Sequence, residues 1–234
     1  MFCSVLIPSR GRANLLAASL ASLESKSEDK ANVEYLVRLD DDEQSSYGNL
    51  LGDSWLDDLE GKVTFGKRGN GYADLATYYD ELAKQAKGDW LLLWNDDALM
   101  LTQNWDRKLK DWARNMAIPG DGIAMLVPKL VGLHGAPQLF WIHRNVFETL
   151  GRLSPIPHVD QWLHPLFAML DRVYYVSIDV WHGDKEMTDL LTQDKISAQF
   201  QNAWYYRRMG LELVSQVGAS RVEDLQKLAA RMGK

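Results

Sequence analysis

The sequence predicts an α/β fold with a mostly parallel central sheet, and three observations lead to this prediction. Short apolar runs with the character of buried strands alternate with segments whose apolar residues recur at helical spacing. Such alternation joins successive strands through right-handed crossovers, which makes the strands parallel. Polar clusters directly follow the predicted strands, at the edge where open α/β sheets form their ligand crevices. We expect one compact domain, for which 234 residues with 46% hydrophobic content are sufficient.

The first half of the chain supplies four predicted strands and two predicted helices. Each strand is a short apolar run followed by a polar loop, and the four runs are Cys3–Ile7, Val33–Leu39, Lys62–Phe65 and Trp90–Trp94. Helical spacing of apolar residues predicts helices over Ala13–Ser25 and Gly71–Lys87, the second of them with Gly88 as its C-cap.

The second half is less regular, and its predicted elements follow from shorter patterns. The predicted helices are Asn104–Met116, Asn145–Leu150, Val159–Leu170, Asp184–Met209 and Arg221–Met232. The predicted strands are Gly122–Val127, Gln138–His143 and Val173–Trp181. The sequence has no internal repeat, low-complexity tract or obvious linker.

Composition excludes several classes of function. A formal net charge of −6 argues against broad non-specific binding to nucleic acid. The single cysteine, Cys3, cannot form an internal disulfide and fits a reducing compartment. The first apolar run is too short for a signal peptide, and no apolar stretch approaches the roughly 20 residues that span a bilayer. We therefore expect a cytoplasmic protein.

The fourth predicted strand ends in two adjacent acidic residues. Asn95, Asp96 and Asp97 follow the apolar run directly. Two carboxylates beside a buried strand are costly unless a cation or a set of hydrogen bonds satisfies them. Mg²⁺ and Mn²⁺ prefer oxygen ligands and also bind phosphate. A solvated turn that uses aspartate for its local hydrogen bonds explains this pattern about equally well on its own.

The loops after the other three strands are also polar. The loop Pro8–Arg12 offers two guanidinium groups, a glycine and the start of a helix, which together can bind an anion. Carboxylates of Asp40–Asp42 can accept hydrogen bonds from a base or a ribose. Lys67–Gly71 can reach phosphates. Each loop, taken alone, also fits an ordinary solvated surface.

The combined order of these motifs resembles that of the nucleotide-sugar glycosyltransferases of the GT-A fold. The closest resemblance is to the large inverting family, family 2, which includes cellulose and chitin synthases. It covers Ser4 to Trp105 well and extends weakly to Lys185. It implies a Rossmann-like three-layer α/β/α sandwich over residues 1–185. Within it, residues 1–105 would bind the nucleotide sugar and residues 106–185 the acceptor, with 186–234 as a helical tail packed on the same domain.

The resemblance also implies roles for individual residues. In this family an Asp-x-Asp motif after the fourth strand holds a divalent ion on the donor diphosphate. Here Asn95 replaces the first aspartate, so Asp97 is the matching metal ligand, and the amide of Asn95 can instead bind the ribose. His182, after the last strand, matches a late histidine that adds a further ligand to Mn²⁺ or Mg²⁺. The predicted nucleotide-sugar contacts are Pro8, Arg10, Arg12, Asp40, Asp41, Arg68, Asn95 and Asp96.

Asp160 is the predicted catalytic base. In the family an acidic residue downstream of the metal motif removes the proton of the acceptor hydroxyl, and Asp160 in the segment HVDQWLHP matches it best. An aspartate in the first turn of a helix also serves as an ordinary cap or dipole partner, which leaves a structural interpretation open.

The predicted function is metal-dependent transfer of a sugar from a nucleoside diphosphate sugar, most simply a UDP-sugar, to a hydroxyl acceptor with inversion. A nucleotidyltransferase is the first alternative, although it would favour a glycine-rich loop with a lysine after the first strand. A non-catalytic nucleotide- or sugar-binding module is the second.

Two acceptors are compatible with the sequence, a glycan and a hydroxymethylated base of phage DNA. An enzyme that modifies a base in duplex DNA would have to flip it out of the stack. The basic residues available for such a substrate are Arg207, Arg208, Arg221, Lys227 and Arg231. A solvated helix face explains these residues as well or better.

Overall fold

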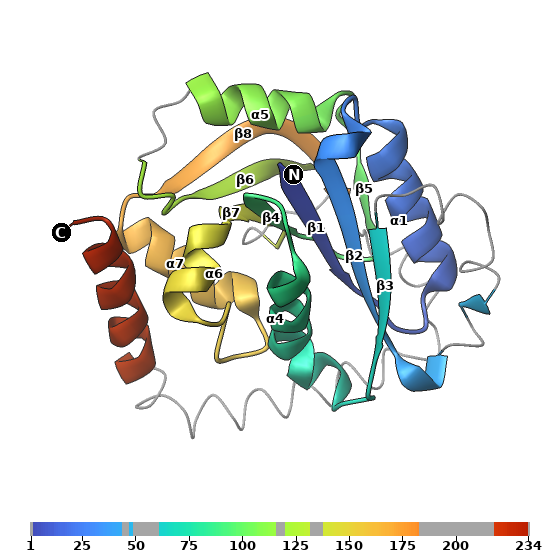
Figure 1. Ribbon diagram of the computed structural model, residues 1–234, viewed down its shortest axis with the longest axis horizontal. Helices are drawn as coiled ribbons and strands as arrows, with labels where there is room; N and C mark the ends of the chain where they lie inside the picture. The colour runs from blue at the N-terminus through green and yellow to red at the C-terminus, as the bar shows by residue number, and fades with distance from the viewer. Residues whose placement is uncertain are drawn as a thin grey trace.

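The computed structural model describes residues 2–43, 47–48, 61–115, 120–131, 138–182 and 218–233. Within these residues the chain forms an eight-stranded sheet with helices on both faces (Figure 1). The strands are β1 Cys3–Pro8, β2 Val33–Asp40, β3 Gly61–Gly66, β4 Trp90–Leu93, β5 Ala98–Met100, β6 Met125–Val131, β7 Phe140–His143 and β8 Val173–His182. The α-helices are α1 Ala13–Ser25, α4 Leu75–Gln85, α5 Trp105–Asn115, α6 Arg144–Leu150, α7 Val159–Met169 and a C-terminal helix over residues 218–231. Three short 3-10 helices are η1 Lys30–Asn32, η2 Asp41–Glu43 and η3 Gly71–Asp74.

The sheet is mixed, and its parallel part comes first in the chain. The strand order is β3-β2-β1-β4-β7-β6-β8-β5. Strands β1 to β4 are parallel to their neighbours within that group, and β6 is parallel to β8. Strand β7 runs antiparallel to β4 and β6, and β5 runs antiparallel to β8. Parallel pairings therefore predominate, as the sequence predicts.

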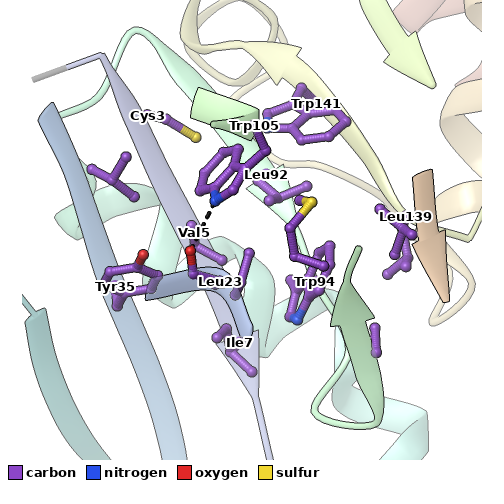
Figure 2. Close-up of a cluster of buried hydrophobic side chains, with 14 of the residues drawn as sticks. Cys3, Val5, Ile7, Leu23, Tyr35, Leu92, Trp94, Trp105, Leu139 and Trp141 are labelled. Atoms are coloured by element: carbon purple, nitrogen blue, oxygen red, sulfur yellow. Dashed lines mark hydrogen bonds between the residues drawn. The ribbon is translucent and has the colours of Figure 1, made fainter. Parts of the chain in front are cut away.

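Side chains of each central strand alternate between two hydrophobic clusters, one on each face of the sheet. In β4, Leu92 packs with α1 and α5, whereas Leu91 and Leu93 pack with α4, α6 and α7. This alternation is the period-two geometry of a strand covered on both faces. Figure 2 shows the first cluster, where Trp105 packs near Trp141 and donates its indole N–H to the carbonyl of Leu23 at 2.9 Å. The predicted three-layer sandwich is confirmed.

Two predictions about single elements are wrong. Helix α4 ends at Gln85, so Gly88 is not its C-cap. Gly88 instead packs against β1, where a Cβ atom would come within 2.5 Å of the backbone nitrogen of Ser4. The predicted strand Gly122–Val127 begins later, at Met125, and continues to Val131.

Two further differences concern segments outside the predicted strands. Strand β5 was not predicted, because three residues are too few to show a period. The predicted helix Asp184–Met209 lies outside the described residues. No helix in the described part of the chain has the length and apolar character needed to cross a membrane.

Candidate active site

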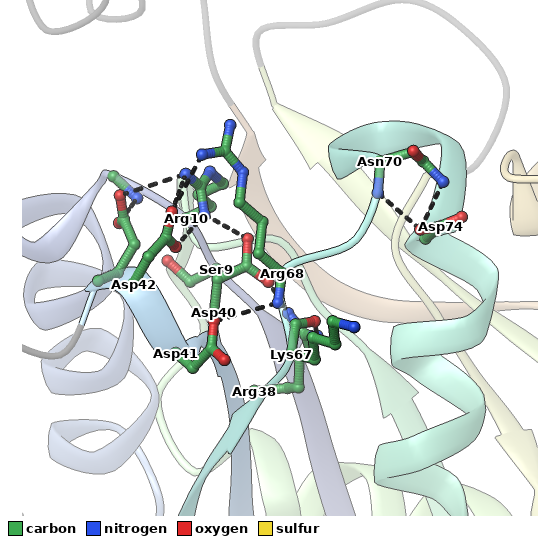
Figure 3. A network of polar contacts seen from close by, with 12 residues as sticks. Ser9, Arg10, Arg38, Asp40, Asp41, Asp42, Lys67, Arg68, Asn70 and Asp74 are labelled. Carbon is green, nitrogen blue, oxygen red and sulfur yellow. Dashed lines mark hydrogen bonds and ion pairs between the residues drawn. The ribbon is translucent and has the colours of Figure 1, made fainter.

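The polar loops that follow β1, β2, β3 and β4 gather at one edge of the sheet. They do so because these four strands are neighbours and parallel, so their carboxyl ends lie on the same side. Hydrogen bonds and ion pairs link the loops directly, and Figure 3 shows the part of this network contributed by β1, β2 and β3. The edge carries nearly all of the predicted nucleotide-sugar contacts.

Arg12 joins the loop after β1 to the acidic residues after β4. Its Nη1 atom donates to Asp96 Oδ1 and to Asp97 Oδ2, each at 3.0 Å. Asp96 also accepts a hydrogen bond of 2.7 Å from Ser9 Oγ. The contact is possible because β1 and β4 are adjacent, so a side chain at the start of α1 reaches across to the end of β4.

His182 lies beside Asp97 because of the pairing between β5 and β8. Ala98 is the register partner of His182, so the residue that precedes β5 faces the end of β8. Nε2 of His182 lies 3.2 Å from Asp97 Oδ1 and 2.8 Å from the amide nitrogen of Asn95. The imidazole, the carboxylate and the amide therefore meet at one point of the sheet edge.

The two adjacent aspartates differ in acidity. Burial raises the pKa of Asp96, and the opposing charge of Arg12 does not offset this effect. Burial also acts to raise the pKa of Asp97, but the hydrogen bond to His182 and the charge of Arg12 together hold it below its usual value. Asp97 is therefore the more firmly ionised of the two and the better candidate for binding a cation.

The Asp97–His182 pair fits a divalent ion. Two neighbouring ligands about 2.1 Å from an octahedral ion lie about 3.0 Å apart, since that distance is larger by the square root of two. The observed separation between Asp97 Oδ1 and His182 Nε2 is 3.2 Å. Among the described residues, no group of three or more His, Cys, Asp or Glu side chains is arranged to hold a metal. Water or donor oxygens would therefore have to complete the coordination, as is usual for Mg²⁺.

Arg10 is oriented away from this pair and towards the end of β2. Its Nη1 atom contacts Asp40 Oδ2 and lies 2.7 Å from Asp42 Oδ1. The other oxygen of Asp40 pairs with Arg38, and Asp40 is only 1% exposed. Asp41, by contrast, is exposed and accepts a hydrogen bond of 3.2 Å from the backbone of Arg68. Of the two carboxylates predicted to contact the base, Asp41 is the accessible one.

Arg38 is a residue of this site that the sequence analysis did not single out. It is 2% exposed, it lies 3.7 Å above the ring of Tyr78, and it donates to the carbonyl of Lys67 at 2.8 Å. A Cβ atom on Gly66 would come within 2.7 Å of its guanidinium group. The signal was present, because an arginine inside the apolar run VEYLVRL must find partners when it is buried. Arg38 holds Asp40 and the loop after β3 in place.

Pro8 and Arg68 belong to the segments that follow or end β1 and β3. Pro8 is the last residue of β1 and pairs in register with Arg38. Arg68 is largely exposed, and its Nη1 atom lies 3.1 Å from Asp42 Oδ2. Pro8 therefore lies next to β2, and Arg68 lies beside a carboxylate that follows β2.

Asp160 lies in the first turn of α7, close to Tyr72 of η3. Burial raises the pKa of Asp160. Burial, together with the charges of Asp160 and Asp97, raises the pKa of Tyr72 to about 12, so both carboxylates act on the same phenol. The hydroxyl of Tyr72 lies 3.4 Å from Nδ1 of His158, and the two rings meet edge to face. Tyr72 thus lies within electrostatic reach of both Asp160 and Asp97.

The C-terminal helix fixes the start of α7. Asp224 is fully buried, accepts a hydrogen bond from the indole of Trp162 at 3.1 Å, and pairs with Arg152 at 3.0 Å. Arg221 stacks on the ring of Trp162, with its guanidinium carbon 4.7 Å from the ring centroid. Lys227 pairs with Glu223 on the same helix. Two of the basic residues considered for DNA binding are therefore engaged within the protein, and Arg207 and Arg208 lie outside the described residues.

No protein-family model and no curated protein sequence matches this chain. Solved structures do match. TarS of S. aureus (1–349) superposes with a TM-score of 0.62 at 16% identity, over 99% of this chain and 71% of that one. Another TarS (1–349) structure, in complex with UDP-GlcNAc, gives a TM-score of 0.59 at 17% identity, over 79% of this chain and 59% of the other.

Two further matches are structures that contain Mn²⁺. The mannosyltransferase PcManGT from Pyrobaculum calidifontis, in complex with GDP-Man and Mn²⁺, gives a TM-score of 0.62 at 14% identity, over 98% of this chain and 73% of that one. GalNAc-T7 with UDP, GalNAc and Mn²⁺ gives a TM-score of 0.55 at 14% identity, over 78% of this chain and 44% of that one. All these proteins are nucleotide-sugar glycosyltransferases of the GT-A type. At such low identity the likeness establishes the fold, and this chain has the GT-A glycosyltransferase fold.

Proposed function

We propose that this protein is a metal-dependent glycosyltransferase that moves a sugar from a nucleoside diphosphate sugar to a hydroxyl acceptor. The observation that carries the proposal is the meeting of Asp97, His182 and Arg12 at the carboxyl edge of a GT-A sheet. A carboxylate and an imidazole suit a divalent ion, and a guanidinium suits a diphosphate. Structural relatives that contain UDP, UDP-GlcNAc or GDP-Man, two of them with Mn²⁺, support the same class of donor.

The proposed division of labour follows the halves of the fold. Residues 1–105 would bind the donor, with Asn95 available to the ribose, Asp41 to the base and Arg68 to phosphate. Residues 106–185 would bind the acceptor. We include the C-terminal helix in the same domain because Asp224 lies buried against α7.

Asp160 would act as the base in a single displacement with inversion. The acceptor oxygen attacks the anomeric carbon from the face opposite the diphosphate, the bond to the diphosphate breaks, and Asp160 takes the proton of the acceptor hydroxyl. Burial raises the pKa of this carboxyl, which makes its ionised form a stronger base. A divalent ion, when bound, supplies positive charge to the departing diphosphate. Arg12 lies close enough to the same acidic pair to share that task.

The test is the thermal unfolding of the protein with UDP, measured with and without Mn²⁺. We expect UDP to raise the midpoint only when Mn²⁺ is present, since a ligand stabilises the state that binds it. Asp97→Ala should abolish this increase, and His182→Ala should reduce it. Asp111→Ala, which alters a largely exposed carboxylate on α5, is the control and should behave as wild type. Equal stabilisation by UDP in excess chelator, for wild type and Asp97→Ala alike, would contradict the proposal. Replacing UDP by GDP tests which nucleobase the donor carries.

A further inference from the structure

One nitrogen atom of Arg12 satisfies both acidic residues after β4. Its Nη1 atom lies 3.0 Å from an oxygen of Asp96 and 3.0 Å from an oxygen of Asp97. The side chain of Arg12 is 20% exposed, and those of Asp96 and Asp97 are 8% and 19% exposed. Charges this well shielded interact more strongly than charges at the surface. Arg12 therefore supplies the positive charge that keeps two adjacent carboxylates together.

The two oxygens of Asp97 have different partners. Oδ2 contacts Arg12, and Oδ1 lies 3.2 Å from Nε2 of His182. A divalent ion held by Oδ1 and Nε2 would therefore lie on the same carboxylate as the guanidinium. Two positive groups so close together repel each other, and partial burial strengthens this repulsion. The ion and Arg12 thus compete for Asp97.

The guanidinium of Arg12 also has capacity for another acceptor. An arginine carries N–H groups on three nitrogens, and Nη1 alone makes the contacts with Asp96 and Asp97. Among the described residues, Nε and Nη2 of Arg12 have no hydrogen-bond acceptor recorded. A diphosphate is the anion that best suits a planar, two-pronged donor.

We propose that Arg12 is an exchangeable counter-ion that couples the binding of the divalent ion to the binding of the donor diphosphate. Without ligands it neutralises Asp97 and keeps the affinity for the free ion low. When ion and diphosphate arrive together, the ion takes over Asp97 and the guanidinium pairs with the diphosphate. This inference rests on the proposed function, because it assumes both the metal site and the diphosphate donor.

The neighbouring Arg10 provides a matched control. It lies in the same loop and is also partly exposed, but its partners are Asp40 and Asp42 rather than Asp96 and Asp97. Removing its charge changes the same loop without freeing the carboxylates after β4. An effect confined to Arg12 would therefore come from the contact with the acidic pair.

The experiment is a titration of the protein with Mn²⁺, followed by the electron paramagnetic resonance signal of the free ion, in the absence of nucleotide. We expect Arg12→Gln to bind Mn²⁺ roughly 10-fold more tightly than wild type, because a like charge next to the site has been removed. The same variant should bind UDP more weakly in calorimetry with saturating Mn²⁺. Arg10→Gln should leave the affinity for Mn²⁺ unchanged. Most substitutions near a metal site weaken binding, so the increase is a distinctive result.

Two outcomes separate this inference from the proposed function. If wild type binds Mn²⁺ only together with UDP, and Arg12→Gln gains no affinity for Mn²⁺ alone, the counter-ion role is wrong while the metal site stands. If neither wild type nor Arg12→Gln binds Mn²⁺ under any condition, both proposals are wrong. A crystal structure of the wild type with UDP and Mn²⁺ gives a second test that needs no variant. An Arg12 that still contacts Asp97 beside the bound ion would overturn the inference.

Discussion

Four aspartates near the candidate site differ because their partners differ. Asp40 is enclosed by Arg10 and Arg38, which leaves it a structural role in the network beneath the site. Asp96 is buried, and its pKa is raised despite Arg12. Asp97 shares Arg12 but also contacts His182, and its pKa is lowered. For Asp160, burial outweighs the backbone hydrogen bond from Gln161 and the influence of His158 and His164, so its pKa is raised. One residue type thus provides a structural contact, a proposed metal ligand and a proposed base.

Asp160→Asn tests the proposed base. The amide keeps the size and most of the hydrogen bonding of the carboxylate but cannot take a proton. We expect sugar transfer to fall by roughly 10²–10⁴-fold, the usual loss when general-base catalysis is removed. The affinity for UDP with Mn²⁺ should stay close to that of wild type. Transfer is measured by mass spectrometry on an acceptor found by screening, and affinity by calorimetry.

Stability distinguishes a catalytic from a structural role of Asp160. A first-turn aspartate contributes at most about 1 kcal/mol through the helix dipole, so the unfolding midpoint should change little. An early-melting variant with a proportionate loss of activity would instead indicate a helix-capping residue. Normal transfer by a stable variant would mean that another residue is the base.

The start of α7 owes its position to contacts with the C-terminal helix. Helix α7 carries Asp160, and its first turn is held by the C-terminal helix through Trp162, Arg152 and Asp224. Cation–π stacking by Arg221 and its hydrogen bond to the carbonyl of Gln161 add to this attachment. The C-terminal helix is therefore part of the support of the candidate site.

Asp224→Ala should loosen this attachment. The substitution leaves the indole N–H of Trp162 and the guanidinium of Arg152 without their buried partner, which we expect to cost about 2–4 kcal/mol. Hydrogen exchange should accelerate in residues 159–163 and 218–231, while β1 and β4 stay protected. Glu223→Ala, one residue earlier, removes an exposed pair with Lys227 and should leave the unfolding midpoint unchanged. Unchanged exchange in α7 would show that the helix is anchored by other contacts.

The molecule as a whole is stabilised by two apolar layers, one on each face of the sheet. Asp80 is a partly buried carboxyl whose ionisation affects the stability of the fold. It accepts a hydrogen bond of 2.7 Å from the backbone of Leu153 and so links α4 to the loop before α7. Burial raises its pKa to about 6, despite that bond and the charges of Lys84 and Arg152.

The raised pKa of Asp80 makes stability depend on pH in a defined direction. Because the unfolded chain loses this proton near pH 3.8 and the folded chain near pH 6, the free energy of unfolding falls as the pH rises through this window. Asp80→Asn removes the titration and should be more stable than wild type at pH 7 by about 1–2 kcal/mol, after allowance for solvent screening. The difference should disappear below about pH 4.

Urea unfolding curves at pH 4, 5, 6 and 7 measure this dependence. Asp111→Asn, on the exposed side of α5, is the control. The difference between its free energy of unfolding and that of the wild type should not change with pH. If the free energies of unfolding of wild type and Asp80→Asn differ by the same amount at all four pH values, the carboxyl of Asp80 has an ordinary pKa in the folded protein.

Local patterns in the sequence were sufficient to predict most of the described elements in their order, and the edge of the sheet where the candidate site lies. Short apolar runs and leucines at helical spacing are short-range features, so they predicted α1, β1, β2 and β4 closely. Because the ends of parallel strands converge, the loop with Arg12 and the loop with Asp97 could be assigned to one site before any distance was known.

The tertiary structure alone decided which of these side chains meet. The pairing of β5 with β8 brings His182 to Asp97, and it joins segments more than eighty residues apart whose register no local period reveals. Direct contacts between side chains decide that Arg12 pairs with Asp97, at 3.0 Å, and that Arg10 pairs with Asp40. Sequence periodicity determines which face of an element a residue occupies. Ion pairs, by contrast, depend on contacts that form only when strands and helices distant in the sequence pack together.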